Sequence, residues 1–257
     1  MKRVIAKVSS NNEIMPHVYL IWLEACFFTS MAMPGQFVML RCGKDTLLRR
    51  PLSIHQTDPE RDRIALLFQV VGQGTNQLAQ LKPGSMVDLL GPLGNGFSLS
   101  DKSHNILLVG GGIGIAPLPF MARVSKDRGC NVTMLLGATT AEQLCPHHLI
   151  PSSIDCITTT DDGTKGEKGF ITDLLPEYIG RADQIFACGP SSMYRVMAKM
   201  PEMRDKAVQI SLEVRMGCGF GLCYGCTIRT KSGLKQVCKD GPVFELNDIF
   251  WNEFVDI

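Results

Sequence analysis

The chain has 257 residues, of which 45% are hydrophobic and 20% charged, and its formal net charge is +1. This length predicts two domains with room for a small third module. The balanced charge offers no basic face for nucleic acid. No long apolar run follows Met1–Lys7 or occurs elsewhere, so we expect no signal peptide, no membrane span and a cytoplasmic protein with reduced thiols.

Residues 2–99 contain six short β-rich segments. Turn-forming residues separate them, beginning with Ser10–Asn12. The segments are residues 4–8, 18–23, 37–41, 52–55, 64–71 and 86–90. Short strands at this density predict a small antiparallel barrel.

Two features of this barrel could bind a ligand. Arg50 and Ser53 lie at the start of one expected strand, with Pro51 and Leu52 between them, and a guanidinium suits bidentate contact with phosphate. The second feature is Gly72–Thr75, a turn between a strand and a short helix whose free N–H groups could bind a pyrophosphate. Each also has a purely structural explanation, as a solvated arginine or a plain strand-to-helix turn.

A glycine-rich loop follows the first buried strand of the middle third. The apolar run 105–109 leads into Gly110–Pro117. Gly112 and Gly114 fit the start of a dinucleotide fingerprint, but Pro117 stands at the third glycine position. A proline is acceptable in the first turn of a helix. We interpret the loop as phosphate-binding, with a structural glycine turn as the alternative.

The middle third continues as alternating strands and helices. Strands are expected at 132–136, 156–159 and 184–187, and helices at 141–149, 171–178 and 191–200. This pattern predicts a parallel sheet that binds ligands at the carboxyl ends of its strands, where Cys188–Ser191 lies. Gly137–Thr140 has no arginine for a 2′-phosphate, which favours NAD over NADP. Asp161–Gly163 is either a ligand contact or a solvated turn.

Four of the ten cysteines lie close together near the C-terminus. Cys218, Cys223 and Cys226 have the spacing C-x4-C-x2-C, and Cys238 follows. This spacing is the ligand pattern of plant-type [2Fe–2S] clusters. A short hairpin after Cys226 would return Cys238 to the site. A structural zinc site usually has two C-x2-C pairs, and disulfides need an oxidising compartment, so both alternatives are weaker.

The order of these modules resembles the ferredoxin reductase superfamily over essentially the whole chain. Within it, the chain is similar to the electron transfer subunits of type B (NAD-linked) dihydroorotate dehydrogenase. The resemblance is carried by Arg50–Ser53, Gly72–Thr75, Gly110–Pro117, Cys188–Pro190 and Leu212–Cys218. It implies a barrel for FAD at residues 1–99, an α/β domain for NAD at 100–210 and a [2Fe–2S] module at 211–257.

The resemblance also implies roles for single residues. Ser53 would face the reactive nitrogen of the flavin and Cys188 the nicotinamide, which makes these two the candidate catalytic residues. The FAD contacts would be Arg50, Pro51, Leu52, Ser53, Leu67, Phe68, Gln69, Gly74 and Thr75. The NAD contacts would be Gly111, Gly112, Gly114, Pro117, Gly189 and Pro190. The cluster ligands would be Cys218, Cys223, Cys226 and Cys238. Leu52 stands where the superfamily often has an aromatic residue, so it would offer only apolar contact.

The implied function is electron transfer. A partner FMN subunit would oxidise dihydroorotate, and electrons would reach NAD⁺ through the cluster and FAD, in an expected heterotetramer. The nearest alternative is the equivalent subunit of a hydrogenase, sulfite reductase or NADPH–ferredoxin transhydrogenase. Cys218 discriminates partly, since transhydrogenase relatives can carry aspartate there. A zinc-stabilised binding module is the distant alternative. Phe250, Trp251 and Phe254 could contact the partner or pack on the chain's own core.

Overall fold

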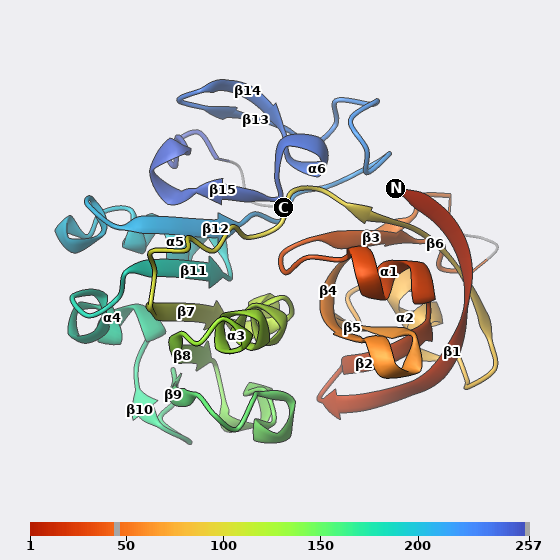
Figure 1. Cartoon of the computed structure of the whole chain (residues 1–257), viewed down its shortest axis with the longest axis horizontal. Coiled ribbons are helices and arrows are strands. Elements are labelled where there is room, and N and C mark those ends of the chain that lie inside the picture. Colours follow the sequence, from red (N-terminus) through yellow and green to blue (C-terminus); the bar gives the residue numbers. More distant parts are fainter. Residues whose placement is uncertain (44–46, 255–257) are drawn as a thin grey trace.

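The structure, a computed structural model, describes residues 1–43 and 47–254. Figure 1 shows a barrel formed by the N-terminal part and an open sheet formed by the middle part, with helices on both of its faces. The C-terminal part, blue in the figure, lies above β12 of the sheet and β3 of the barrel. No helix within the described ranges is long and apolar enough to cross a membrane.

The predicted barrel is confirmed. Its six strands close in the order β1-β2-β5-β4-β3-β6, and every neighbouring pair is antiparallel. The strands are β1 (Lys2–Met15), β2 (Val18–Glu24), β3 (Phe37–Leu40), β4 (Arg50–Asp58), β5 (Arg63–Gln69) and β6 (Met86–Leu93). The intervening helical elements are α1 (Cys26–Met31), η1 (Pro59–Arg61) and α2 (Gln73–Ala79). Alternating apolar residues fill the barrel interior, as period-two strands require.

The turn expected at Ser10–Asn12 is wrong. These residues lie inside β1, and the chain reverses at Pro16 and His17. The side-chain amide of Asn11 donates to the carbonyl oxygens of residues 78, 79 and 81 at 3.0, 3.1 and 3.0 Å. Residues 78 and 79 end α2 and residue 81 follows it, so the amide caps the carbonyl end of this helix. A residue that favours turns therefore serves a long-range contact with a helix end.

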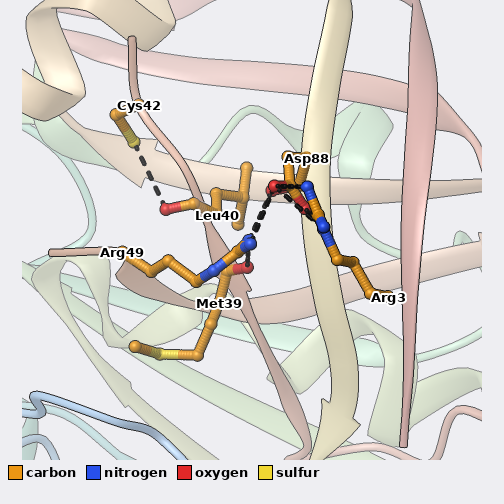
Figure 2. Close-up of polar contacts among 6 residues, drawn as sticks. All are labelled: Arg3, Met39, Leu40, Cys42, Arg49 and Asp88. Carbon is orange, nitrogen blue, oxygen red and sulfur yellow. Dashed lines mark hydrogen bonds and ion pairs between the residues drawn. The ribbon is translucent and has the colours of Figure 1, made fainter. Parts of the chain in front are cut away.

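An ion-pair network ties three strands of the barrel together (Figure 2). Arg49 places Nη2 2.8 Å from Asp88 Oδ2, and its Nη1 donates to the carbonyl oxygens of Asp88 and Met39 at 2.9 and 3.3 Å. Arg3 donates to the same carboxylate through Nε and Nη2. Burial opposes ionisation of Asp88, but the hydrogen bonds from Arg3 and Arg49 outweigh it and hold its pKa below the ordinary value.

The predicted parallel sheet is also confirmed. Its order is β10-β9-β8-β7-β11-β12-β15, and only β15 runs antiparallel to its neighbour. The strands are β7 (Asn105–Gly111), β8 (Asn131–Ala138), β9 (Asp155–Thr160), β10 (Glu167–Lys168), β11 (Gln184–Cys188), β12 (Ala207–Ser211) and β15 (Val243–Glu245). Helix α3 (Leu118–Asp127) packs on one face, whereas α4 (Ile171–Ile179) and α5 (Ser191–Met197) pack on the other. The glycine loop forms η2 (Gly112–Ile115), and η5 (Pro201–Met203) precedes β12.

Two features of this sheet differ from the expectation. The helix expected at 141–149 is wrong, because the segment forms two single turns, η3 (Ala141–Gln143) and η4 (His147–Leu149). Pro146 lacks an N–H and restricts the residue before it, which prevents one continuous helix. Strands β10, β12 and β15 were not expected. β15 has three residues and gains its partner from a distant part of the chain, which no local pattern reveals.

The barrel and the sheet share a buried contact. Residues 15, 18, 20, 65 and 67 of the barrel belong to the same apolar core as α3 and one face of the sheet. Within this contact His55 is fully buried, and its Nδ1 lies 2.7 Å from the carbonyl oxygen of Ala116. Arg123 donates to the carbonyl and hydroxyl oxygens of Thr57 at 2.6 and 2.8 Å. These bonds fix α3 and the preceding loop against β4.

The C-terminal part packs on both the barrel and the parallel sheet. It contains β13 (Thr227–Thr230), β14 (Gly233–Gln236), α6 (Val237–Asp240) and η6 (Leu246–Asp248), and the predicted hairpin returns Cys238 to the other cysteines. The Trp251 ring lies 5.5 Å from that of Tyr194, and its indole N–H donates to the Leu246 carbonyl at 3.0 Å. Packing on the chain's own core, one of the two uses expected for these aromatics, is therefore confirmed for Trp251.

Replacing Asp88 with asparagine is expected to lower the free energy of unfolding by about 1–3 kcal/mol, because two arginines would lose a charged acceptor in a largely buried site. The pKa of Asp88 lies below its ordinary 3.8, so its carboxylate adds stability above about pH 4 and loses that contribution as the pH falls through the folded-state pKa. Denaturation curves at about pH 7 and pH 3 measure the effect, which should shrink at the lower pH.

The matched control is Asp101→Asn. The Asp101 side chain is 98% exposed and lies 3.5 Å from Arg128, so its ion pair should contribute almost nothing. Equal losses in the two variants, or a loss at Asp88 that does not depend on pH, would contradict the role given to the network.

Candidate functional site

The two ligand features of the barrel lie next to each other. Arg50 begins β4, and Gly74 lies in the first turn of α2. A Cβ on Gly74 would be 3.2 Å from Arg50 Nε, so the guanidinium rests against this turn. Arg50 Nη1 also donates to the Leu48 carbonyl at 2.7 Å, which holds the side chain in place. A cation beside free N–H groups suits a diphosphate.

The hydroxyl group of Thr75 shapes this turn from within. It accepts hydrogen bonds from the N–H groups of Val71 and Gly72 at 3.0 and 3.2 Å, and it donates to the Gly72 carbonyl at 3.1 Å. With these partners in place, the hydroxyl serves the turn, and a phosphate here would meet mainly backbone N–H groups. Its expected contact with FAD stays a prediction.

The expected flavin-lining residues occupy different environments. Leu67 and Phe68 are each 2% exposed, and the Phe68 ring stacks on Tyr19 with centroids 5.9 Å apart. Gln69 is exposed at the end of β5. Leu52 and Ser53 lie half-buried on β4, paired in register with β3. Leu67 and Phe68 could therefore meet a flavin through little more than their backbone, while Ser53 keeps an accessible side chain.

A cavity of about 620 Å³ opens at the carboxyl ends of the parallel strands. Six of the residues expected at the nicotinamide site line it, whereas Pro117 lies outside it and precedes α3. The six are Gly111, Gly112, Gly114, Cys188, Gly189 and Pro190. Gly114 brings two loops together, because a Cβ there would overlap the carbonyl oxygen of Cys188. The cavity lies between β7 and β11, where the strand order changes direction and such folds bind ligands.

The Cys188 thiol is protonated at neutral pH. Burial, together with the nearby Glu213 carboxylate, raises its pKa to about 12. The Tyr194 hydroxyl links two residues that line the cavity, because it donates to the Ser211 carbonyl at 2.7 Å and accepts from the Gly189 N–H at 2.9 Å. A neutral thiol here can offer shape and a weak polar contact, and it is a poor nucleophile.

Sequence reasoning missed several residues of the cavity. Ser211 and Glu213 end and follow β12, a strand that was not expected. Recognising that strand would have placed both at a carboxyl end, the position where ligands bind. Burial in the cavity wall raises the pKa of Glu213. Asp161 of the acidic loop, for which a ligand contact was one of two expectations, lines the cavity together with Thr139.

The cysteine loop brings the four predicted thiols into two pairs. Cys226 Sγ lies 3.3 Å from Cys238 Sγ. The Cys223 N–H points at Cys218 Sγ from 3.5 Å, and the Leu222 N–H donates to the same sulfur at 3.3 Å. Gly221 donates to Cys238 Sγ at 3.2 Å. Backbone donors directed at sulfur stabilise an anionic iron–sulfur cluster and tune its reduction potential.

The electrostatics of the loop favour a thiolate at Cys218 and a protonated thiol at Cys238. Burial opposes ionisation of Cys218, but N–H groups of Phe220, Cys223 and Leu222 outweigh it and lower its pKa to about 6. Burial and the adjacent Cys226 raise the pKa of Cys238 to about 12, so a metal must displace a proton from this pair. Within the described ranges no three His, Cys, Asp or Glu side chains converge on one ion position. Cys226 contacts Cys238, and the Cys223 side chain interacts with Cys218.

The fold and these sites define a class of protein, a flavin- and nicotinamide-linked reductase with an iron–sulfur module. The family model "Oxidoreductase FAD-binding domain" matches residues 21–97, and "Iron-sulfur cluster binding domain of dihydroorotate dehydrogenase B" matches residues 213–250. A solved NADH-dependent reduced ferredoxin-NADP oxidoreductase, from work on flavin-based electron bifurcation, has a TM-score of 0.89 at 31% identity over 97% of this chain and 91% of that one. The ferredoxin reductase in carbazole 1,9a-dioxygenase (TM-score 0.70, 18% identity, covering 81% of this chain and 68% of that one) shares the fold.

Curated relatives narrow the class to one family. The protein named "Dihydroorotate dehydrogenase B (NAD(+)), electron transfer subunit" from Desulforamulus reducens is 37% identical over 96% of this chain and 97% of its own length. The protein of the same name from Bacillus cereus is 38% identical over 94% of this chain and 96% of its own length. The chain belongs to the family of dihydroorotate dehydrogenase B (NAD⁺) electron transfer subunits.

Replacing Gly114 with alanine is expected to weaken NADH binding by about tenfold or more, because the new Cβ would force apart two loops that line the cavity, and small displacements of positioned groups are costly. Titration calorimetry with NADH measures the effect. Gly180→Ala is the matched control, since Gly180 has φ −57° and open space around a Cβ. Equal affinities of the two variants would contradict the assignment of the cavity to the dinucleotide.

Proposed function

We propose that this chain is the electron transfer subunit of a dihydroorotate dehydrogenase complex. It carries electrons from dihydroorotate, oxidised in a partner FMN subunit, through a [2Fe–2S] cluster and FAD to NAD⁺. The observation that carries the proposal is the order of the three sites in space. The cysteine loop packs against β3, and the flavin segment of β4 pairs with β3. The nicotinamide cavity opens at the carboxyl ends of the parallel strands, and the loop that lines it is joined to β4 by the His55–Ala116 hydrogen bond.

The residues would divide the work as follows. Arg50 and the first turn of α2 would hold the FAD diphosphate, and Ser53 would face the flavin ring. The Gly111–Gly114 loop and Gly189–Pro190 would bind NAD beside Cys188, whose protonated thiol excludes a competing charge. The four cysteines would hold the cluster. When bound, the cluster supplies single-electron transfer, and the flavin converts single electrons into the hydride that NAD⁺ accepts.

The proposal includes the expected division into a barrel (1–99), an α/β unit (100–210) and a cluster module (211–257). It also includes a heterotetramer with the FMN subunit and a cytoplasmic location, supported by the need for reduced thiols at the cluster site. NAD is preferred over NADP because Gly137–Thr140 has no arginine and Asp161 adds a carboxylate to the cavity wall.

Replacing Asp161 with serine is expected to raise kcat/KM with NADP⁺ by about tenfold, which corresponds to removing about 1.4 kcal/mol of repulsion toward a 2′-phosphate. Steady-state rates with both nucleotides measure it. Asp162→Ser is the control, because the Asp162 carboxylate accepts from the N–H and hydroxyl of Thr164 at 2.9 and 2.6 Å. A change of the same size with NAD⁺ would contradict selection by Asp161.

Replacing Cys226 with serine is expected to abolish the cluster while FAD stays bound, because one thiolate of the buried pair is lost. Iron and sulfide analysis, flavin absorbance and EPR of the reduced protein measure both groups. Cys26→Ser, at an exposed cysteine of α1, should keep the full iron content. A colourless parent protein that contains zinc would contradict the redox proposal itself.

The decisive experiment is copurification with the FMN subunit, followed by an assay of dihydroorotate-dependent NAD⁺ reduction. The expected result is activity that requires both chains. Activity with H₂, sulfite or reduced ferredoxin, and none with dihydroorotate, would assign the chain to a different complex.

A further inference from the structure

Met39 joins the barrel to the cysteine loop. It lies on β3 and is fully buried, like its neighbours Val38 and Leu40. Those neighbours belong to the core inside the barrel. Met39, which points to the opposite side of the strand, belongs to the core that contains Cys226 and Cys238. One strand therefore supplies side chains to two different cores.

The backbone of the cysteine loop rests on the Met39 side chain. Gly219, which follows the predicted ligand Cys218, has φ +84°. A Cβ on Gly219 would lie 2.5 Å from Met39 Cγ and 2.8 Å from Sδ. The absence of a side chain at this position lets the loop approach the barrel closely. Methionine, unbranched and polarisable, is suited to fill such an irregular space.

The backbone of Met39 is fixed as firmly as its side chain. Met39 pairs in register with Pro51, which belongs to the proposed flavin segment of β4. Its carbonyl oxygen accepts from Arg49, and Arg49 is held by Asp88, as Figure 2 shows. Any shift of Met39 would disturb the β3–β4 pairing or this ion pair. The residue thus has rigid contacts toward both proposed cofactor sites.

We propose that Met39 is a positioning residue that sets the separation between the cysteine loop and the flavin segment. Through its contact with Gly219 it fixes how fast single electrons pass between the two groups bound there. This rests on the proposed function, in which FAD and a [2Fe–2S] cluster occupy these sites. The contact with Gly219 separates Met39 from residues that merely fill the core.

The test uses Met39→Ala and Met39→Leu in the complex with FAD and cluster bound. NADH gives a hydride, with two electrons, to the flavin, and the flavin passes one electron to the oxidised cluster. Stopped-flow absorbance follows flavin reduction, and rapid-freeze EPR follows the reduced cluster. Met39→Ala should slow the second step severalfold, because electron transfer becomes slower as the cysteine loop moves away from the flavin segment. Met39→Leu has a side chain of similar volume, so its rate of electron transfer to the cluster should stay close to that of the parent protein.

Three further readouts separate positioning from folding. In Met39→Ala, flavin reduction by NADH, iron content and the cluster's midpoint potential should stay at the parent values, because the ligands and their N–H donors are unchanged. Met203→Ala truncates a buried methionine of the same core near α5, and it should leave electron passage unchanged. Gly219→Ala disturbs the same contact from the side of the cysteine loop and should also slow electron transfer between the flavin and the cluster. The double variant Met39→Ala/Gly219→Ala should be faster than Gly219→Ala alone, because the overlap is relieved.

Several results would overturn the inference. These are an unchanged electron-passage rate in Met39→Ala, loss of iron from that variant, or equal slowing of flavin reduction by NADH. Loss of iron would mean that Met39 only retains the cluster. A parent protein without FAD or iron would instead overturn the proposed function, so the two failures are distinguishable.

Discussion

The buried contact between β4 and the loop before α3, which includes the His55–Ala116 hydrogen bond, sets the relative placement of the two proposed nucleotide sites. His55 lies two residues beyond Ser53 on β4, and Ala116 follows the glycine loop that lines the cavity. Burial lowers the pKa of His55 to about 4, so the ring is neutral at physiological pH and Nδ1 carries the donated proton. A neutral donor therefore makes this bond at and around neutral pH. The barrel and the sheet therefore meet at a fixed geometry.

Close approach of backbone segments recurs on both sides of the proposed flavin segment. Gly114 lets the glycine loop meet the carbonyl of Cys188, and Gly219 lets the cysteine loop meet Met39. In both places a Cβ would separate elements that come from distant parts of the chain. Electron and hydride transfer both depend on short, fixed distances, so these glycines serve the spacing of the sites more than the flexibility of the loops.

The sequence predicts those parts of the structure that have a local pattern. Short β-rich segments between turns predict the barrel, a continuous apolar run predicts β7, and the cysteine spacing predicts a ligand set. Features that depend on long-range contacts cannot be predicted from such local patterns. Asn11 looks like a turn residue but binds the end of α2, and Glu213 reaches the cavity only because β12 joins the sheet. Met39 looks like ordinary barrel core until its strand is seen to face a second core.

The C-terminal part cannot owe its structure to its own contacts alone. Its hairpin, β13 and β14, has two strands, and an isolated two-stranded hairpin is marginal in water. Its support comes from three directions: β15 pairs with β12 of the sheet, Trp251 packs on Tyr194, and Gly219 rests on Met39. Metal binding adds folding free energy where the ligands are not preformed. Here contacts with the barrel and the sheet already bring the thiols together. Those contacts therefore place the loop, and a bound cluster would add further stability. The position of the cluster relative to the flavin is therefore a property of the whole chain.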